Sequence, residues 1–563
     1  MLLLDPRKLT REHSDARSHE VMRKTIDFFE RRGKKKLMAD YYSYEWYGEF
    51  VDYVGREKLF ATLCTPSGYG AADSRWDTWR NCEFAEILGF YGLQYWYVWQ
   101  VSVLGLGPIW MSENEPLKQR TARLLEEGGI FAFGLSEQAH GADIYSTSMA
   151  LEPVGEGNYR ANGRKYYIGN GNKAALVSVF GRVGKDYIFF AAAPGHERYR
   201  LVKNVVASQN YVSEFALEDY PVGESDILHK GGAAWDAALN TINIGKFNLG
   251  WASIGICTHA FYEAIQHASR RILYGNPVTD MSHVRKMFVD AWARLVAMKL
   301  FALRAADYMR SASAEDRRYL LFNPMTKMKV TTQGEEVINL LWDAIAARGF
   351  ERDQYFSQAA IDIRALPKLE GTVHVNVALL VKFMPSYFFN PADLPEVPQR
   401  ADAANDDFLF EQGPAKGLGT IRFHDYAKAY RLFDTPNVAI FREQIAVYRQ
   451  MLADCPPADE QLRDVDFLLA SGHIFALVVY GQLILENAKI YAIPAEWVDE
   501  IFDVLVRDFA RYALDLSQKP GTNEAQMARC LQMLRKPVRD EARYQRIFAE
   551  QVLPLRDGYL MPD

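Results

Sequence analysis

The strongest constraint on the fold of this 563-residue chain is a change in its hydrophobic spacing. Between residues 18 and about 127, apolar residues recur three and four positions apart, which is the spacing of one helix face. Between 149 and 222 the pattern changes to short apolar runs bounded by Gly, Asn and Pro, which is typical of strands. These runs predict strands at 149–154, 159–168, 176–183, 187–193 and 212–217. A β domain is therefore expected in the middle of a mainly helical chain.

Helical spacing returns after residue 234, and the patterns at 237–274, 283–310, 331–348 and 372–388 predict a four-helix bundle. Further helices are expected at 438–453, 464–489, 495–517 and 523–534. The expected fold class is α+β, mainly α. Its parts are an N-terminal helical domain (1–128), a middle β-barrel or sandwich domain (129–230), a four-helix bundle (231–390), a linker rich in Pro, Asp and Gly (391–419), and an extra helical domain (420–563).

Composition excludes several classes of function. Lys and Arg number 65 against 71 Asp and Glu, and a net charge of -6 does not favour nucleic acid. The five cysteines form no CxxC pair and have no His partners at ligand spacing, so we expect no metal site and a cytoplasmic location. Two stretches without charged residues, 87–111 and 467–485, contain Gln and Gly and are interpreted as buried core helices.

The segment 364–372 places a proline, one carboxylate and then Gly-Thr directly before an apolar helix. That order predicts Glu370 on a turn held between rigid elements, where a catalytic base is useful. The alternative is that Glu370 is an ordinary exposed acid before a helix capped by Thr372. The residues of this segment alone leave both interpretations open.

Four segments, in order, resemble motifs of the acyl-CoA dehydrogenase family. Residues 131–143 (FAFGLSEQAHGAD) resemble its flavin-binding signature, with Gln138 and Ala142 where Pro and Ser are usual. Residues 165–171 (KYYIGNG) are similar to Lys-x-Trp-Ile-Thr-Asn-Gly, and residues 271–277 (RILYGNP) are similar to Arg-x-x-Phe-Gly-x-Pro. Residues 369–372 (LEGT) match the segment that carries the catalytic glutamate of the family.

The resemblance implies a homodimeric, FAD-dependent enzyme that converts acyl-CoA to trans-2-enoyl-CoA, with electron transfer flavoprotein as electron acceptor. Glu370 would remove the α-proton, and FAD N5 would take the β-hydride, because no side chain accepts a hydride. The implied cofactor-binding residues are Leu135, Ser136, Gly141, Ala142, Tyr167, Gly169, Arg271, Tyr274, Ala347, Thr372 and His374. The implied substrate residues are Asn243, Lys246 and Gly371.

Some positions depart from the family pattern. Gly169 stands where threonine bonds the flavin, Tyr167 replaces tryptophan, and Ala346 and Ala347 replace glycines. The loss of glycines at Ala346 and Ala347 suggests a non-catalytic scaffold or assembly factor as an alternative. An acyl-CoA oxidase is another alternative.

Residues 243–247 (NIGKF) and the C-terminal helices resemble the very-long-chain branch of the family, which indicates fatty acid metabolism and a long acyl chain. Peripheral membrane contact through 391–419 is a further expectation, by the same resemblance. Ala142 replaces a serine that helps near CoA in the family, so an acyl-carrier thioester stays open as the substrate.

Overall fold

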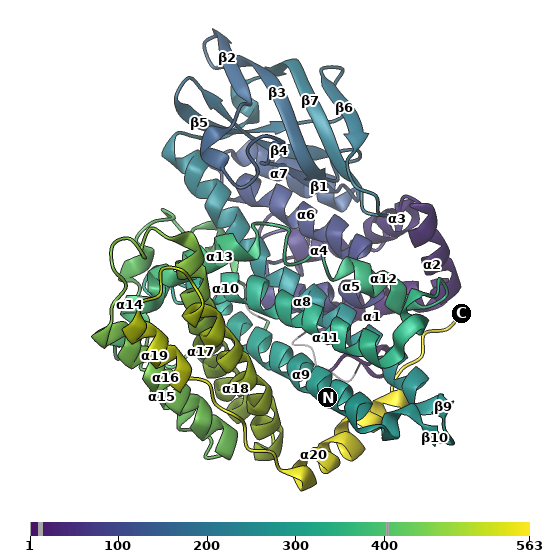
Figure 1. The fold of residues 1–563 in the computed structure, drawn as a ribbon. Coiled ribbons are helices and arrows are strands. Elements are labelled where there is room, and N and C mark those ends of the chain that lie inside the picture. The colour runs from purple at the N-terminus through teal and green to yellow at the C-terminus, as the bar shows by residue number, and fades with distance from the viewer. Residues whose placement is uncertain (1, 10–14, 401, 404) are drawn as a thin grey trace. The chain divides into compact units, whose positions relative to one another are not determined.

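The computed structural model describes residues 2–9, 15–400, 402–403 and 405–563 (Figure 1). The chain forms two compact units. Unit 1 contains Met1–Thr10, Leu249–Arg400 and Gly417–Met561, and unit 2 contains Arg11–Asn248, Ala401–Lys416 and Pro562–Asp563. The helix α8 (Gly232–Arg270) contributes its first part to unit 2 and its second part to unit 1.

The N-terminal helices belong to unit 2. They are α1 (Ala16–Arg32), α2 (Lys34–Ser43), α3 (Gly48–Arg56), α4 (Leu59–Cys64), α5 (Thr78–Tyr91), α6 (Leu93–Trp110) and α7 (Glu115–Glu126). Every residue of α5 and α6 is buried, which agrees with the interpretation of 87–111 as core. Within the linker, Leu409 and Phe410 are buried, and the Trp76 and Phe410 rings meet edge to face at 4.9 Å.

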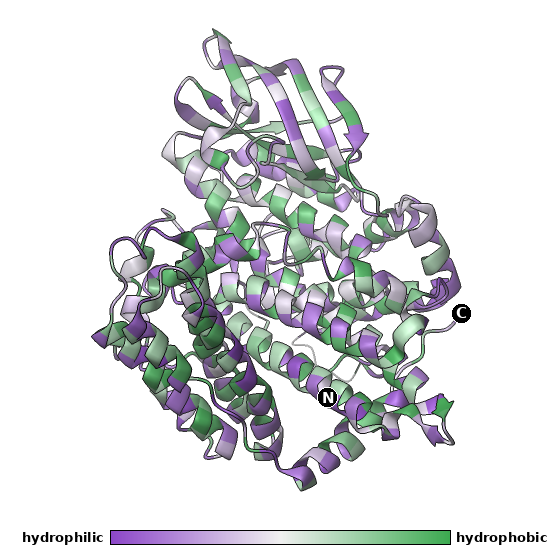
Figure 2. Cartoon of the chain, viewed as in Figure 1, coloured by the Kyte–Doolittle hydropathy of each residue, from purple (hydrophilic) through white to green (hydrophobic). Residues whose placement is uncertain are grey.

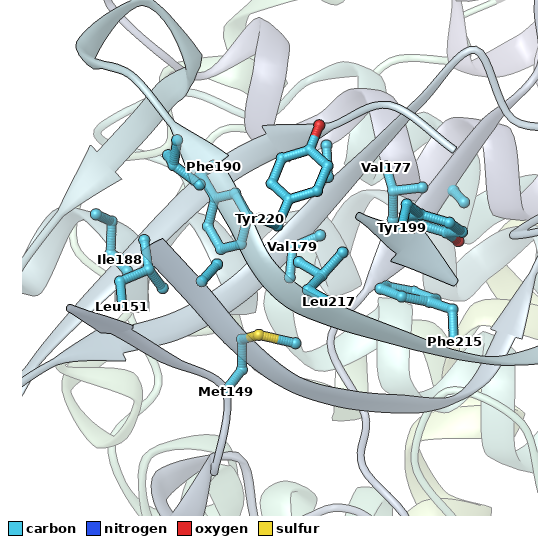
Figure 3. Packing of buried hydrophobic residues seen from close by; sticks show 14 of the residues in the cluster. Met149, Leu151, Val177, Val179, Ile188, Phe190, Tyr199, Phe215, Leu217 and Tyr220 are labelled. Carbon is cyan, nitrogen blue, oxygen red and sulfur yellow. The ribbon is translucent and has the colours of Figure 1, made fainter. Parts of the chain in front are cut away.

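The middle of unit 2 is one sheet of eight strands: β1 (Phe131–Gly134), β2 (Ala150–Gly155), β3 (Asn158–Gly169), β4 (Leu176–Val183), β5 (Asp186–Ala192), β6 (Tyr199–Asn204), β7 (Val212–Val222) and β8 (Ile227–Lys230). The strand order is β6-β7-β3-β2-β4-β5-β8, and β1 pairs with β4 in parallel. Hydrophilic and hydrophobic residues both occur along β3 and β7 (Figure 2). Val212–Leu217 of β7 are all buried, whereas β3 carries exposed and half-buried residues between its buried ones. The inward side chains, including Met149, Phe190 and Phe215, form a buried cluster (Figure 3).

Unit 1 is helical. After α8 come the short hairpin β9 (Ile272–Leu273) and β10 (Asn276–Pro277), then α9 (Ser282–Arg310), α10 (Tyr319–Met325), a turn of π-helix (Thr326–Val330), α11 (Thr331–Ile345), α12 (Tyr355–Asp362), α13 (Val373–Leu380) and α14 (Met384–Phe389). The C-terminal part adds α15 (Ala427–Tyr430), α16 (Pro436–Asp454), α17 (Val465–Ile490), α18 (Ala495–Ser517), α19 (Glu524–Gln532) and α20 (Glu541–Ile547).

Buried ion pairs join the C-terminal helices to α9. The guanidinium of Arg294 on α9 donates to both carboxylate oxygens of Asp508 on α18, at 2.7 and 2.9 Å. Arg304 on α9 likewise pairs with Glu486 on α17 at 2.9 Å. The helix α17 is long and apolar enough to cross a membrane by length and composition, but 83% of its most apolar window is buried inside the protein. It therefore serves as a core helix of unit 1.

The predicted fold class is confirmed, and the strand predictions locate five of the eight strands. The spacing analysis missed β1, β6 and β8, which have four, six and four residues. Runs of four residues, as in β1 and β8, carry little periodic signal, and β1 has all four residues buried, so it shows no alternation. The strand β6 is as long as the predicted β2 but is mostly exposed and polar. The predicted domain boundaries stay predictions.

Candidate active site

Glu370 lies on an irregular turn between α12 and α13 in unit 1. It has a left-handed backbone, with φ of 53°, and Gly371 follows with φ of 86°. For a residue with a side chain, this conformation costs on the order of 1–2 kcal/mol, and such strain is concentrated at functional sites. Thr372 then caps α13, and its hydroxyl accepts from the Val375 N–H at 3.4 Å. The turn and the cap are both as the sequence predicted.

Two side chains that the sequence analysis overlooked hold this turn. Lys327, fully buried on the π-helical turn, donates from Nζ to the Pro367 carbonyl at 2.7 Å and to the Gly371 carbonyl. Asn376 donates from Nδ2 to the carbonyls of Gly371 and Thr372 at 3.2 and 2.8 Å. The Glu370 turn is therefore fixed on both sides. In the sequence, only a lysine within the mostly apolar segment 319–330 could have indicated this support. In the structure, that lysine lies on a π-helical turn, and such turns often mark functional sites.

The carboxylate of Glu370 is partly sheltered, because the residue is half-buried and its Oε2 atom is buried. His374, the predicted cofactor contact, is exposed on the first turn of α13. His374 lies close enough to α17 to affect the pKa of His473 on that helix. Burial first, then the Lys329 ammonium and His374, lower the pKa of His473 to about 4.

In unit 2, the loop after β1 is tied to β3 by its backbone. The Leu135 carbonyl accepts from Lys165 Nζ at 2.9 Å, and the Ser136 carbonyl accepts from the Tyr166 N–H at 3.0 Å. Lys165 also pairs with Glu137 at 2.8 Å. Burial raises the pKa of Glu137, but the Lys165 ammonium and hydrogen bonds from Thr147 and the Ser148 N–H together lower it below its usual value. The motif glutamate is thus structural, and the predicted loop residues Gly141 and Ala142 are exposed.

Tyr167 is the most informative residue of the β3 motif. The pairing of β3 with β7 shifts register between Lys165 and Ile168, and Tyr167 adopts a φ of 63° within that bulge. Bulges re-aim side chains, and Tyr167 is 59% exposed. An aromatic face left open in this way is suited to stacking on a planar ring.

The replacement of threonine by Gly169 has a structural reason. A Cβ at this position would lie 2.7 Å from Cε1 of Tyr97 and 2.7 Å from Cγ1 of Val101, both on α6, and 2.9 Å from the Tyr97 hydroxyl. These separations are too short for carbon atoms in contact. The space of the family side chain is therefore filled by α6.

The third motif forms the β9–β10 hairpin in unit 1. Tyr274 and Gly275 form its turn with φ of 53° and 83°, and Tyr274 is 95% exposed. Arg271 is also exposed. Ala346 and Ala347 stand where the family has glycines. Ala346 has φ of 52° and ψ of -130°, a conformation that suits glycine, and Ala347 beside it is exposed.

The candidate substrate residues on α8 lie in unit 2. Asn243 is half-buried and Lys246 is 7% exposed. They are three positions apart and thus on one face of the helix. The structure brings Glu370, Gly371, Thr372 and His374 together in unit 1, and it brings Ser136 next to the Tyr167 segment in unit 2. Among the described residues, no group of three or more His, Cys, Asp or Glu side chains is arranged to hold a metal ion.

Residues 232–384, which contain the Glu370 turn, match the family model of the acyl-CoA dehydrogenase C-terminal domain. The chain is therefore similar to the acyl-CoA dehydrogenase family over this segment. It is similar to the short-chain specific acyl-CoA dehydrogenase of Megasphaera elsdenii, with 24% identity over 35% of this chain and 54% of that enzyme. It is also similar to an acyl-CoA dehydrogenase of Bacillus subtilis (strain 168), with 22% identity over 50% and 75% of the two chains. The first alignment thus spans about half of the relative.

Solved structures of acyl-CoA dehydrogenases share the fold. The structure from Bacillus anthracis, complexed with FAD, matches with a TM-score of 0.75 and 16% identity over 99% of this chain and 97% of that chain. Butyryl-CoA dehydrogenase from Megasphaera elsdenii matches with a TM-score of 0.58 and 18% identity over 66% of this chain and 99% of that chain. The fold of nearly the whole chain, including its C-terminal helices, is therefore shared with the Bacillus anthracis structure.

Proposed function

We propose that this protein is an FAD-dependent oxidoreductase that removes two hydrogens from an acyl thioester, converting acyl-CoA to trans-2-enoyl-CoA. The observation that carries the proposal is Glu370 in a strained, doubly anchored turn, inside the segment that matches the family model. A carboxylate held in place can abstract a proton from a carbon next to a thioester without reorganising. The chemistry proposed for Glu370 is abstraction of the α-proton.

Unit 2 has side chains suited to holding FAD. Tyr167 offers an open aromatic face, and the loop at Ser136 is fixed to the same strand. Thr372 and His374 of unit 1 are proposed as further cofactor contacts from the family resemblance alone. When bound, FAD supplies the acceptor for the β-hydride. The FAD of a second subunit would be contacted by Arg271, Tyr274 and Ala347. The exposed hairpin that carries Tyr274 supports a homodimer.

The remaining residues would orient the substrate. The Glu370 N–H would donate to the thioester oxygen, where negative charge develops as the proton leaves. Lys327 would keep the backbone on both sides of Glu370 in place, and Gly371 would leave room for the thioester next to the base. Asn243 and Lys246 would contact the acyl-CoA.

We further propose that electron transfer flavoprotein accepts the electrons, and that the substrate has a long acyl chain, as is typical of fatty acid metabolism and of the very-long-chain branch. We also propose a cytoplasmic location and peripheral membrane contact through residues 391–419. An acyl-carrier thioester is a second candidate substrate. It is favoured by Ala142 and by the fold likeness to a prolyl acyl carrier protein oxidase, with a TM-score of 0.56 and 19% identity. Release of peroxide in air would identify an oxidase instead.

The test is the anaerobic bleaching of bound flavin by a series of acyl-CoAs, comparing Glu370→Gln with the native protein. Loss of a general base lowers rates about 10²–10⁴-fold, so bleaching should slow by that factor while flavin stays bound. Glu351→Gln, at an exposed acid paired with Arg348, is the matched control and should bleach normally. Unchanged bleaching in Glu370→Gln would exclude this base. A purified protein that binds no flavin would instead favour the scaffold alternative.

A further inference from the structure

A second ligand-sized site lies in the C-terminal part of unit 1. It is a groove of about 640 Å³, within the roughly 300–1,000 Å³ usual for small-molecule sites. Its lining residues are Phe389, Tyr426, Ala427, Tyr430, Arg431, Arg442, Ile445, Ala446, Arg449, Gln450 and Ala453. The last six are three or four positions apart on α16 and form one face of that helix. We call this site the α16 groove.

The floor of the α16 groove is apolar. Phe389, at the end of α14, is 41% exposed, which is unusual for a ring of this size next to a packed core. Tyr430 donates its hydroxyl to the Val478 carbonyl at 2.6 Å, so its polar atom is satisfied within the protein. Ala446 and Ala453 keep the wall of α16 shallow. The groove can therefore accept an unbranched hydrocarbon.

The acids of α16, Glu443 and Asp454, are paired with Arg535 and Arg529 and are not part of the groove lining. The groove itself is lined by three arginines and no acid. Arg431 is paired with Asp425 at 3.3 Å. The groove thus combines an apolar floor with an excess of positive charge.

The other two arginines are available for a ligand. Arg449 lies over the Phe389 ring at 5.7 Å, and neither Arg442 nor Arg449 has an ion pair with a carboxylate in the part of the chain that the structure describes. A guanidinium binds a carboxylate through two parallel hydrogen bonds. One planar anionic head with an apolar tail matches both features.

We propose that the α16 groove binds the anion of a long-chain fatty acid, with its carboxylate on Arg442 and Arg449 and its chain along Phe389 and Tyr430. A groove of this volume fits one such chain. The site uses none of the residues proposed for dehydrogenation, so it stands independently of that function.

The test is calorimetric titration of the full-length protein with myristate, and with tetradecanol as the neutral analogue of equal length. We expect one saturable site for myristate and binding of tetradecanol weaker by about tenfold, because one charge-assisted interaction is lost. Arg442→Gln with Arg449→Gln should weaken myristate by at least about tenfold and remove the preference for the acid. Arg535→Gln, which lies outside the groove, should bind normally.

A second variant keeps the test valid if the double variant fails to fold. Ala446 is exposed, so Ala446→Trp fills the groove without entering the core and should abolish binding. Myristate binding that persists in Ala446→Trp belongs to another site and overturns the proposal. Equal affinity for the acid and the alcohol also overturns it. The proposal is also overturned if the native protein binds no myristate and Ala446→Trp sediments with a lower mass than the native protein. The groove would then be an interface with a second copy of the chain.

Discussion

Replacing Lys327 by Met tests whether the Glu370 turn is held by the buried ammonium. Lys327 is fully buried and donates to the carbonyls of Pro367 and Gly371, one on each side of Glu370. Hydrogen bonds to charged groups contribute about 1.5–3 kcal/mol each. Methionine fills similar volume but leaves both carbonyls without this donor. The free energy of unfolding should therefore fall by about 3–6 kcal/mol.

The catalytic effect should be separate from the loss of stability. Without Lys327, the turn can relax, and a misplacement of about 1 Å at a reacting group costs about 10²-fold in rate. Flavin bleaching by acyl-CoA should slow by that factor at a temperature where the variant is fully folded by circular dichroism. Because Lys327 acts through Glu370, the pH dependence of the residual rate should keep the native midpoint.

The matched control is Lys329→Met. Lys329 lies on the same π-helical turn and is also buried, but its ammonium lies over the rings of Tyr480 and Tyr512, at 5.6 and 5.3 Å. It should leave the bleaching rate unchanged. The reasoning is refuted if Lys327→Met bleaches at the native rate, or if both variants slow equally.

Three further predictions concern stability, each measured by urea unfolding. Because burial lowers the pKa of His473 to about 4 from an unfolded value of 6.5, the folded state resists protonation, and stability should fall by up to about 3 kcal/mol between pH 6.5 and 4. His473→Asn should flatten this fall relative to the exposed-site control His283→Asn, and an unchanged pH profile would contradict it. Gly169→Thr should cost about 1–3 kcal/mol by overpacking against Tyr97 and Val101, and a neutral result would show that α6 yields. Ala346→Gly should stabilise by about 1 kcal/mol, because it relieves a φ of 52°; destabilisation would argue against strain there.

Much of the helical architecture could be predicted from spacing. The pattern at 495–517 coincides with α18 (Ala495–Ser517), and the pattern at 283–310 differs from α9 (Ser282–Arg310) by one residue. The pattern at 331–348 was less accurate, since α11 ends at Ile345 and a tighter helical turn continues through Ala346–Phe350. The left-handed backbone of Ala346 interrupts the helix there, and hydrophobic spacing does not report backbone angles.

The sequence suggested the residues of the candidate site but not the side chains that hold the Glu370 turn. The order of segments identified Glu370, its cap Thr372 and the aromatic Tyr167. Lys327 was not identified, because it is 40 positions from Pro367 and 44 from Gly371. A contact at that separation leaves no local pattern beyond the presence of a lysine in the mostly apolar segment 319–330. The arginines of the α16 groove were overlooked for the same reason, since their significance depends on which arginines are paired with acids in the folded protein.

The sequence by itself determined the succession of helical, strand and helical segments and placed one acid before a capped helix. Periodicity and capping are local properties, and neighbouring residues suffice to express them. Only the tertiary structure decided that the acid sits in a strained turn held by a buried lysine, that a bulge exposes Tyr167, and that α6 occupies the space beside Gly169. Those features depend on close packing between segments that are distant in the sequence, so they arise only when the core has assembled.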